Sequence, residues 1–254
     1  TIATIRMLTR PPRRTYASAL ASGRPGDPSE LPVPSSHPHH TWSWKQWAFR
    51  TQGLELPVWE VEGLDATGPT IILTHGWGDS RVGALPRISN FAPIASRLIA
   101  WDMPGHGDAP GTCSLGTTEV DALADLIEQL TVDVTSRVVL YGWSLGAGVS
   151  IAAAAKRTAG ASAPVVAVIA ENPYRLARTP AANVLRLARL PHTPALDVSL
   201  WFLDRFGRTP GLTRHDFDRQ VHAARLTVPL LVIHGEDDNV CPVADGRDIA
   251  ASAR

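Results

Sequence analysis

The stretch YGWSLGAG, residues 141–148, follows the apolar run SRVVL and precedes an alanine-rich segment. A serine between two glycines, at the end of a buried strand and the start of a helix, is typical of a nucleophile elbow. Neighbouring backbone approaches such a turn closely, so the residues two before and two after the serine must be small, as Gly142 and Gly146 are. The pattern predicts that Ser144 is a nucleophile, and a tight turn without chemistry is the alternative.

Apolar runs on both sides of this stretch predict the fold. Runs that read as buried strands, without alternating polar residues, occur at 70–76, 95–102, 136–142, 164–172 and 228–238. Helical segments separate them, and continuous apolar strands are typical of sheets covered on both faces. The sequence therefore predicts an α/β fold, a mostly parallel sheet flanked by helices. Within it, residues 118–130 predict a helix, with Thr118 and Asp121 placed like a capping box, and Gln52-Gly53 predicts a β-hairpin turn.

The chain has 254 residues and is 44% hydrophobic, which favours one sizeable domain. Residues 1–40 are rich in Pro, Arg, Ser and Gly and predict an extended, poorly ordered arm before a domain at 41–254. At about 173–226, two proline-punctuated helical stretches interrupt the strand–helix rhythm. We expect this insertion to form a small cap over the carboxyl ends of the strands, and the alternative is ordinary crossover helices.

Composition limits the class of partner and the compartment. The formal net charge of zero gives no argument for a nucleic-acid partner, and no apolar run is long enough for a membrane-spanning helix. Cys113 and Cys241 lack zinc or disulfide spacing, which favours a reducing compartment and a cytoplasmic location. The start TIATIRML, followed by arginines, leaves an upstream membrane anchor as the alternative.

An acyl-transfer serine needs backbone donors for the oxyanion that forms during attack. One donor is the N–H of the next residue, Leu145, at the start of a helix. The second donor is expected from the loop after an earlier strand, where the stretch ILTHGWG offers the N–H of Trp77. His75 in this loop is expected to tie the loop by hydrogen bonds rather than to act as a base.

Four motifs together carry a family resemblance: HGWG (75–78), DMPGHG (102–107), GWSLG (142–146) and HGEDDNVCP (234–242). Their order and spacing resemble the α/β-hydrolase superfamily over roughly residues 45–254, and in particular its short-capped esterases, lipases, thioesterases and aminopeptidase-like hydrolases. The resemblance implies a serine hydrolase that cleaves an ester, thioester or amide bond through an acyl-enzyme, with no metal or organic cofactor. It also implies that residues 102–107 shape the pocket wall.

The acid of a catalytic triad is expected after the strand PLLVI, and the resemblance implies Asp238. The alternative acid is Glu171 at the end of the preceding strand, unless it forms a local pair with Arg175. No histidine follows Asp238, since the last one is His234, and a serine without a base is a weak nucleophile. We therefore expect a fragment that stops before its last strand and catalytic histidine and has little turnover. A catalytically inactive binding module with the same fold is the alternative.

The sequence indicates the substrate class less clearly than it indicates the fold. Residues 175–225 contain nine arginines against four aspartates, together with Trp201 and Phe202, which suits an anionic amphipathic substrate such as a lipid head group. Solvated outer faces of helices are the alternative. We expect a small-molecule or lipid-like acyl substrate, with membrane association left open. A dehalogenase would need a carboxylate at position 144, and the stretch HPHH (37–40) lies in the arm, so no metal site is expected.

Overall fold

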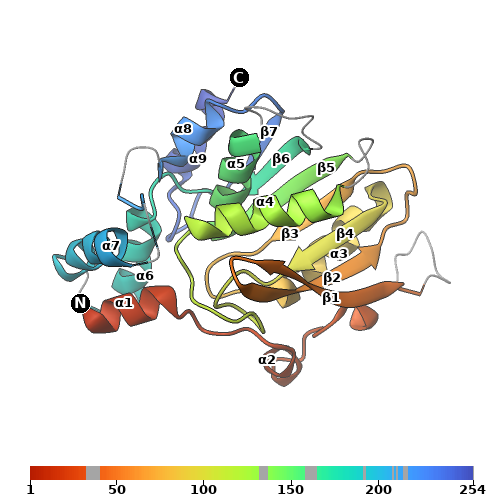
Figure 1. The fold of residues 1–254 in the computed structure, drawn as a ribbon, viewed down its shortest axis with the longest axis horizontal. Helices are drawn as coiled ribbons and strands as arrows, with labels where there is room; N and C mark the ends of the chain where they lie inside the picture. Colours follow the sequence, from red (N-terminus) through yellow and green to blue (C-terminus); the bar gives the residue numbers. More distant parts are fainter. Residues whose placement is uncertain are drawn as a thin grey trace.

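The computed structural model describes residues 1–32, 41–131, 137–157, 165–190, 193–207, 209, 211–213 and 217–253. In this part of the chain, seven strands form one sheet in the order β1-β2-β4-β3-β5-β6-β7 (Figure 1). The strands are β1 (Trp44–Thr51), β2 (Leu54–Glu62), β3 (Thr70–Thr74), β4 (Arg97–Trp101), β5 (Val138–Trp143), β6 (Val165–Glu171) and β7 (Leu230–Ile233). Strands β3 to β7 are mutually parallel, so the predicted α/β fold is confirmed.

Strands β1 and β2 form the predicted antiparallel hairpin at one side of the sheet. Its two-residue turn places Gln52 at φ 51° and Gly53 at φ 74°. Left-handed conformation at both positions matches the right-handed twist of the flanking strands. Strand β2 then pairs antiparallel with β4 and joins the hairpin to the parallel part of the sheet.

The central strands are apolar throughout because helices cover both faces of the sheet. Helices α4 (Thr118–Leu130) and α5 (Leu145–Arg157) lie on one face, and α3 (Leu85–Phe91) lies on the other (Figure 1). Along β3, Ile72 packs into the core under α4 and α5, whereas Ile71 and Leu73 pack into the core under α3. Every residue of β3 is buried as a result, which explains the continuous apolar run.

The start of α4 differs from the prediction. The helix spans the predicted residues, but Thr118 and Asp121 do not form a capping box. Instead the buried carboxylate of Glu119 accepts hydrogen bonds from the backbone N–H of Ser114, at 2.6 Å, and of Gly116, at 3.0 Å. Asp121 points outward and pairs with Lys156 on α5, so its side chain is not available to the helix end.

The amino-terminal segment also differs from the predicted extended arm. It contains α1 (Ile2–Thr9), α2 (Tyr16–Ala21) and the short 3-10 helix η1 (Pro28–Glu30). Leu8 of α1 is buried in the main core, the backbone N–H of Cys113 donates to the carbonyl of Thr9, and Arg13 donates to the carbonyl of Gly107. The prediction of an extended arm relied on the overall polar, proline-rich composition. The apolar side chains of α1 recur at helical spacing and allow this part to fold against the core. Residues 33–40, including HPHH, lie outside the described residues.

The insertion at 173–226 divides into two parts. Helices α6 (Arg178–Leu187) and α7 (Ala195–Phe206) pack against each other, and α7 packs against α1, away from both faces of the sheet (Figure 1). Helix α8 (Arg219–Ala223) instead packs against α5 and α9 (Val243–Ser252), as an ordinary crossover helix does. Helix α8 thus fits the crossover alternative, whereas a cap formed by α6 and α7 stays a prediction.

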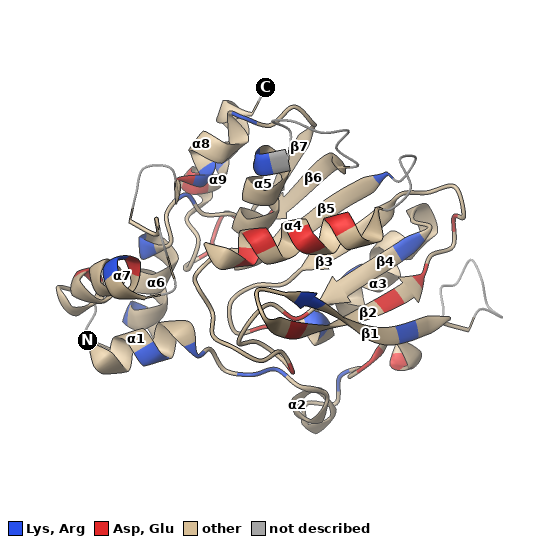
Figure 2. Cartoon of the chain, in the orientation of Figure 1, with Lys and Arg blue, Asp and Glu red and all other residues tan. Residues whose placement is uncertain are grey.

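Charge and apolar surface are unevenly distributed. Acidic residues band the outer side of α4, whereas arginines lie on α1, α6 and α7 (Figure 2). No helix in the described residues combines the length and apolar character needed to cross a bilayer.

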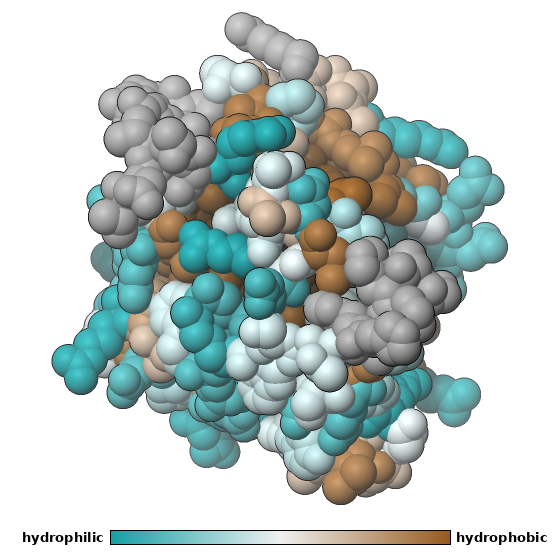
Figure 3. All heavy atoms as spheres, turned by 90° about the vertical axis from the view of Figure 1, so that its right-hand side faces the viewer, coloured by the Kyte–Doolittle hydropathy of each residue, from teal (hydrophilic) through white to brown (hydrophobic). Residues whose placement is uncertain are grey.

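The face on the right-hand side of Figure 1, which is turned toward the viewer in Figure 3, carries a hydrophobic area in its upper part. In the described chain β7 pairs only with β6, and its Leu231 is 55% exposed, so this edge is open to pairing with another strand.

Candidate active site

Ser144 occupies the turn between β5 and α5 in a left-handed conformation, with φ 52°. Such a φ is strained for a residue with a side chain. A Cβ atom at Gly142 would lie 2.2 Å from the carbonyl oxygen of Gly146, and one at Gly146 would lie 1.9 Å from the carbonyl oxygen of Thr74. The strand–turn–helix geometry predicted from YGWSLGAG is therefore present, and both glycines are required by backbone contacts.

The loop after β3 lies directly against this turn. A Cβ atom at Gly76 would lie 3.4 Å from the Cβ atom of Ser144. Among the described residues, the backbone N–H groups of Trp77 and Leu145 find no protein acceptor. Neither N–H group would have to give up a protein partner to serve as an oxyanion donor, and that role stays a prediction.

His75 holds this loop in place, as the sequence predicted. Its Nε2 accepts a hydrogen bond from the backbone N–H of Met103 at 3.0 Å, so Nδ1 carries the proton and donates to the carbonyl of Gly76 at 2.8 Å. The ring is buried and packs edge-on against His106, with 4.8 Å between the ring centroids. Burial lowers the pKa of His75, which keeps the imidazole neutral.

The buried His106 predicts a loss of stability in acid. Burial lowers its pKa to about 3, so between about pH 6.5 and pH 3 the unfolded chain binds a proton that the folded chain does not. We expect the free energy of unfolding to fall by about 3 kcal/mol between pH 6.5 and about pH 4.5, at about 1.4 kcal/mol per pH unit, with His75 adding in the same direction. Urea denaturation at several pH values measures this slope. The His106→Gln variant should show a flatter slope, and a slope equal to that of the wild type would contradict the assignment.

The stretch DMPGHG forms a fixed wall beside the loop. The buried carboxylate of Asp102 accepts hydrogen bonds from the backbone N–H of Arg81, from its guanidinium and from the backbone N–H of Asp108, all at 2.7–2.9 Å. A Cβ atom at Gly107 would lie 2.3 Å from this carboxylate. These contacts fit the structural role that the family resemblance implied for residues 102–107.

Asp238 lies in the loop after β7 with its carboxylate held from three sides. Its Oδ1 accepts hydrogen bonds from the backbone N–H groups of Val240 at 2.7 Å and Cys241 at 2.8 Å, and its Oδ2 accepts one from the amide of Asn172 at 2.6 Å. Asn172 directly follows β6, and its own amide oxygen accepts from the backbone N–H of Gly235. The sequence analysis did not single out Asn172, although a polar side chain at a strand end was the signal available.

Glu171, the alternative acid, is engaged elsewhere. Its carboxylate forms a bidentate ion pair with the guanidinium of Arg87, at 2.6 and 2.8 Å, and accepts a hydrogen bond from the hydroxyl of Tyr141. The expected pair with Arg175 does not form, because Arg175 pairs with Asp218 instead. Of the two carboxylates, Asp238 is the one bonded to the backbone N–H of Cys241, whose Sγ lies 3.7 Å from Ser144 Oγ.

Cys241 is the side chain in contact with the serine hydroxyl. Its Sγ lies 3.7 Å from Ser144 Oγ, and burial raises the pKa of the thiol to about 12, so it stays protonated. His234 donates a hydrogen bond through Nε2 to the carbonyl of Cys241 at 2.8 Å, which fixes its ring within the loop. No described histidine is hydrogen-bonded to Ser144. His192 and His215 lie outside the described residues.

Above Ser144 the protein encloses a cavity of about 210 Å³. Its walls come from the β3 loop, from α1 and from the start of the insertion, and they are almost entirely apolar. The lining residues are Leu8, Trp77, Leu115, Ser144, Leu145, Tyr174, Ala177, Pro180, Ala181, Val184 and Val240. Helices α1 and α6 therefore reach the serine, and the α1 contribution was not foreseen from the sequence.

The parallel sheet, the strained turn and the loop against it define an α/β hydrolase. The model of the alpha/beta hydrolase family matches residues 71–253, so the chain belongs to that family.

Among curated proteins, the chain is similar to the lysophosphatidylserine lipase ABHD12 of Rattus norvegicus, with 29% identity over 216 residues, covering 82% of this chain and 52% of that protein. It is also similar to the biotin biosynthesis bifunctional protein BioHC of Cellvibrio japonicus, with 34% identity over 149 residues, covering 57% of this chain and 25% of that protein. The chain thus spans about half the length of the lipase. Among solved structures, the Pyrococcus furiosus esterase Pf2001 has a TM-score of 0.66 at 18% identity, covering 96% of this chain and 84% of that one, which shows a shared fold.

Proposed function

We propose that this chain is a serine hydrolase that cleaves carboxylic esters through an acyl-enzyme on Ser144. The observation that carries the proposal is the placement of Ser144 at φ 52° between two glycines, at the floor of an apolar cavity and beside two unbonded amides. Lipases and esterases among the similar proteins support an ester rather than an amide or thioester substrate.

In the proposed reaction, Ser144 Oγ attacks the ester carbonyl carbon while its proton passes to a base. The N–H groups of Trp77 and Leu145 donate to the carbonyl oxygen as it becomes negative. The bond to the leaving alkoxy group then breaks, and that group takes the proton, which leaves the acyl group on Ser144. Water attacks the acyl-enzyme in the second half and releases the carboxylic acid. Asp238 is the proposed acid that orients the base, and Asn172 positions Asp238.

No histidine among the described residues is hydrogen-bonded to Ser144, so these residues do not supply the base of the proposed reaction. A serine without an adjacent base reacts slowly, so we expect slow ester hydrolysis by the protein alone. A soluble base that enters the cavity should then restore part of the rate. An inactive binding module with the same cavity is the competing function, and it predicts no rate that depends on Ser144.

The test measures hydrolysis of p-nitrophenyl acetate and butyrate with increasing imidazole. We expect little turnover without imidazole and, with it, a rate about tenfold or more above that of the Ser144→Ala variant, whose rate reports imidazole acting in solution. Equal rates for the two proteins at every imidazole concentration would overturn the serine hydrolase. Robust turnover without imidazole that is lost in Ser144→Ala would keep the nucleophile and show that a base is already in place.

A lipid-like substrate is the proposed class, and the surface of α7 supports it. Val198, Trp201, Phe202 and Phe206 recur at helical spacing on the outer side of α7 and are between 45% and 61% exposed. Residues 1–10 and 178–206 around them carry six arginines against two aspartates. Aromatic rings flanked by arginine suit the surface of an anionic bilayer. Because α6 packs on α7 and also lines the Ser144 cavity, α6 and α7 would act as a cap that brings lipid to the serine.

The double variant Trp201→Ser/Phe202→Ser should bind anionic phospholipid vesicles about tenfold or more weakly than the wild type in co-sedimentation. Losing two half-buried rings forfeits about 2 kcal/mol of apolar transfer free energy. Ile94→Ser, which removes another exposed apolar side chain on a different part of the surface, is the matched control and should leave binding unchanged. Equal binding by the wild type and the double variant would rule out α7 as the lipid-facing surface.

A further inference from the structure

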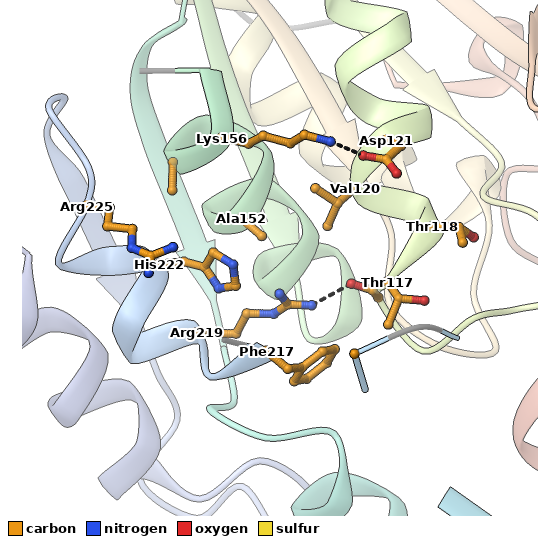
Figure 4. Close-up of a pocket in the computed structure, with 13 residues that line it drawn as sticks. Thr117, Thr118, Val120, Asp121, Ala152, Lys156, Phe217, Arg219, His222 and Arg225 are labelled. Atoms are coloured by element: carbon orange, nitrogen blue, oxygen red, sulfur yellow. Dashed lines mark hydrogen bonds and ion pairs between the residues drawn. The ribbon is translucent and has the colours of Figure 1, made fainter. Parts of the chain in front are cut away.

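A second cavity, of about 320 Å³, lies between α4, α5 and α8 (Figure 4). It shares no lining residue with the cavity at Ser144. Among the described residues, three cations line it, those of Lys156, Arg219 and Arg225, and one carboxylate, that of Asp121. The proposed ester hydrolysis makes no use of this cavity.

Arg219 forms the floor of the cavity and is almost fully buried, with 1% of its surface exposed. Figure 4 shows its side chain projecting from α8 into the space below His222. Its Nη2 donates to the carbonyl of Gly116 at 2.6 Å, and its guanidinium carbon lies 4.1 Å from the centre of the Phe217 ring. Within the described residues no carboxylate pairs with it, and its Nε has no acceptor.

Two glycines leave space for the side chain of Arg219. A Cβ atom at Gly116 would lie 2.8 Å from Nη2, and one at Gly148 would lie 3.0 Å from Nε. Glu119, a buried carboxylate on α4, is occupied by the backbone N–H groups of Ser114 and Gly116 rather than by Arg219. Burying a charge without a partner is costly, so buried arginines normally face an anion. Burial also lowers the pKa of Arg219, which marks the cost of keeping it charged there.

A second cation stands at the rim of the same cavity. Lys156 extends from α5 and pairs with Asp121 on α4, and Figure 4 shows this pair above Arg219. Both side chains are more than half exposed, so the pair is weak and can open. An anion in the cavity would then face a planar guanidinium on one side and a mobile ammonium on the other. Two cations on separate sides suit a dianion with several oxygens better than a single carboxylate.

We propose that this cavity binds a phosphate-sized oxyanion, either orthophosphate or the phosphate group of a small organic phosphate, between Arg219 and Lys156. The inference is independent of the proposed ester hydrolysis, because it uses none of the residues at Ser144. Binding places the negative charge beside a buried cation that has no carboxylate partner in the described part of the chain. The site should therefore prefer phosphate over chloride at equal ionic strength.

Calorimetric titration of the 254-residue protein with orthophosphate, in buffer whose ionic strength is held constant with sodium chloride, tests the proposal. We expect saturable binding, lost in Arg219→Met and weakened about tenfold or more in Lys156→Gln, because each change removes one charged hydrogen bond. The Asp121→Asn variant is the matched control, because it should change the affinity for phosphate in the opposite direction. It removes the competing carboxylate and should tighten phosphate binding about two- to fivefold. The two surface variants keep the test decisive if Arg219→Met fails to fold.

Glycerol 3-phosphate in a parallel titration separates the two sources of the phosphate group. Tighter binding than orthophosphate supports an organic phosphate as the ligand, and weaker binding supports the free anion. No saturable binding of either compound by the wild type overturns the proposal. So does phosphate binding that is unchanged in both Lys156→Gln and Asp121→Asn.

Discussion

Replacing Gly146 by alanine is expected to destabilise the fold by about 3 kcal/mol or more and to remove any reaction at Ser144. A Cβ atom at this position would lie 1.9 Å from the carbonyl oxygen of Thr74, which belongs to the buried strand β3. Backbone cannot yield as a flexible side chain can, so α5 must move away from the sheet. Overpacking of this kind costs about 1–3 kcal/mol in an ordinary core, and the rigid strand puts this site at the upper end or beyond.

Gly235→Ala is the matched control, since nothing lies within 4 Å of a Cβ atom at that position. We expect its free energy of unfolding in urea to stay within about 0.5 kcal/mol of the wild type. If Gly146→Ala were as stable as Gly235→Ala, the contact between the turn and β3 would not exist as described. The nucleophile elbow would then lose its structural basis.

Replacing Ser144 by glycine is the second large expected effect, and it acts in opposite directions on reactivity and stability. The hydroxyl is the only proposed nucleophile, so every rate that depends on it should vanish, a loss of about 10³-fold or more where a base is present. The residue sits at φ 52°, a conformation that glycine adopts without strain, so the variant should gain about 1 kcal/mol of stability. The strained backbone at Ser144 would then lower the stability of the fold while it presents the reactive hydroxyl.

Ser144→Ala separates the two effects, because alanine keeps the backbone strain and loses the hydroxyl. Its reactivity should match that of Ser144→Gly, whereas its stability should match that of the wild type. Thermal denaturation of the three proteins gives the comparison. A Ser144→Gly protein no more stable than Ser144→Ala would show that the turn is relaxed and that its geometry carries no functional strain.

Local sequence patterns were enough to predict most of the fold. Continuous apolar runs located β3 to β7, and the periodicity of 118–130 matched α4. The turn at Ser144 was predictable because a short motif contains both glycines. Gly142 is crowded by Gly146 within that motif, whereas Gly146 is crowded by Thr74 on the neighbouring strand β3.

Contacts between distant residues were not predictable in the same way. Ser144 meets Cys241 across 97 positions, Asn172 meets Asp238 across 66, and Glu171 meets Arg87 across 84. Nothing local distinguishes Arg87 from Arg175 as the partner of Glu171. The prediction of an extended amino-terminal arm was wrong for a related reason. The burial of Leu8 depends on a core built from residues far along the chain.

Labelling with a fluorophosphonate probe tests the central claim that Ser144 is a nucleophile presented to a bound acyl group. The probe would be added to the folded 254-residue protein with imidazole present, and the modified peptide would be identified by mass spectrometry. We predict one phosphonylated residue, Ser144, and none in Ser144→Ala. Recovery of an unmodified Ser144 from the folded protein, or the same labelling of both proteins at another residue, would contradict it.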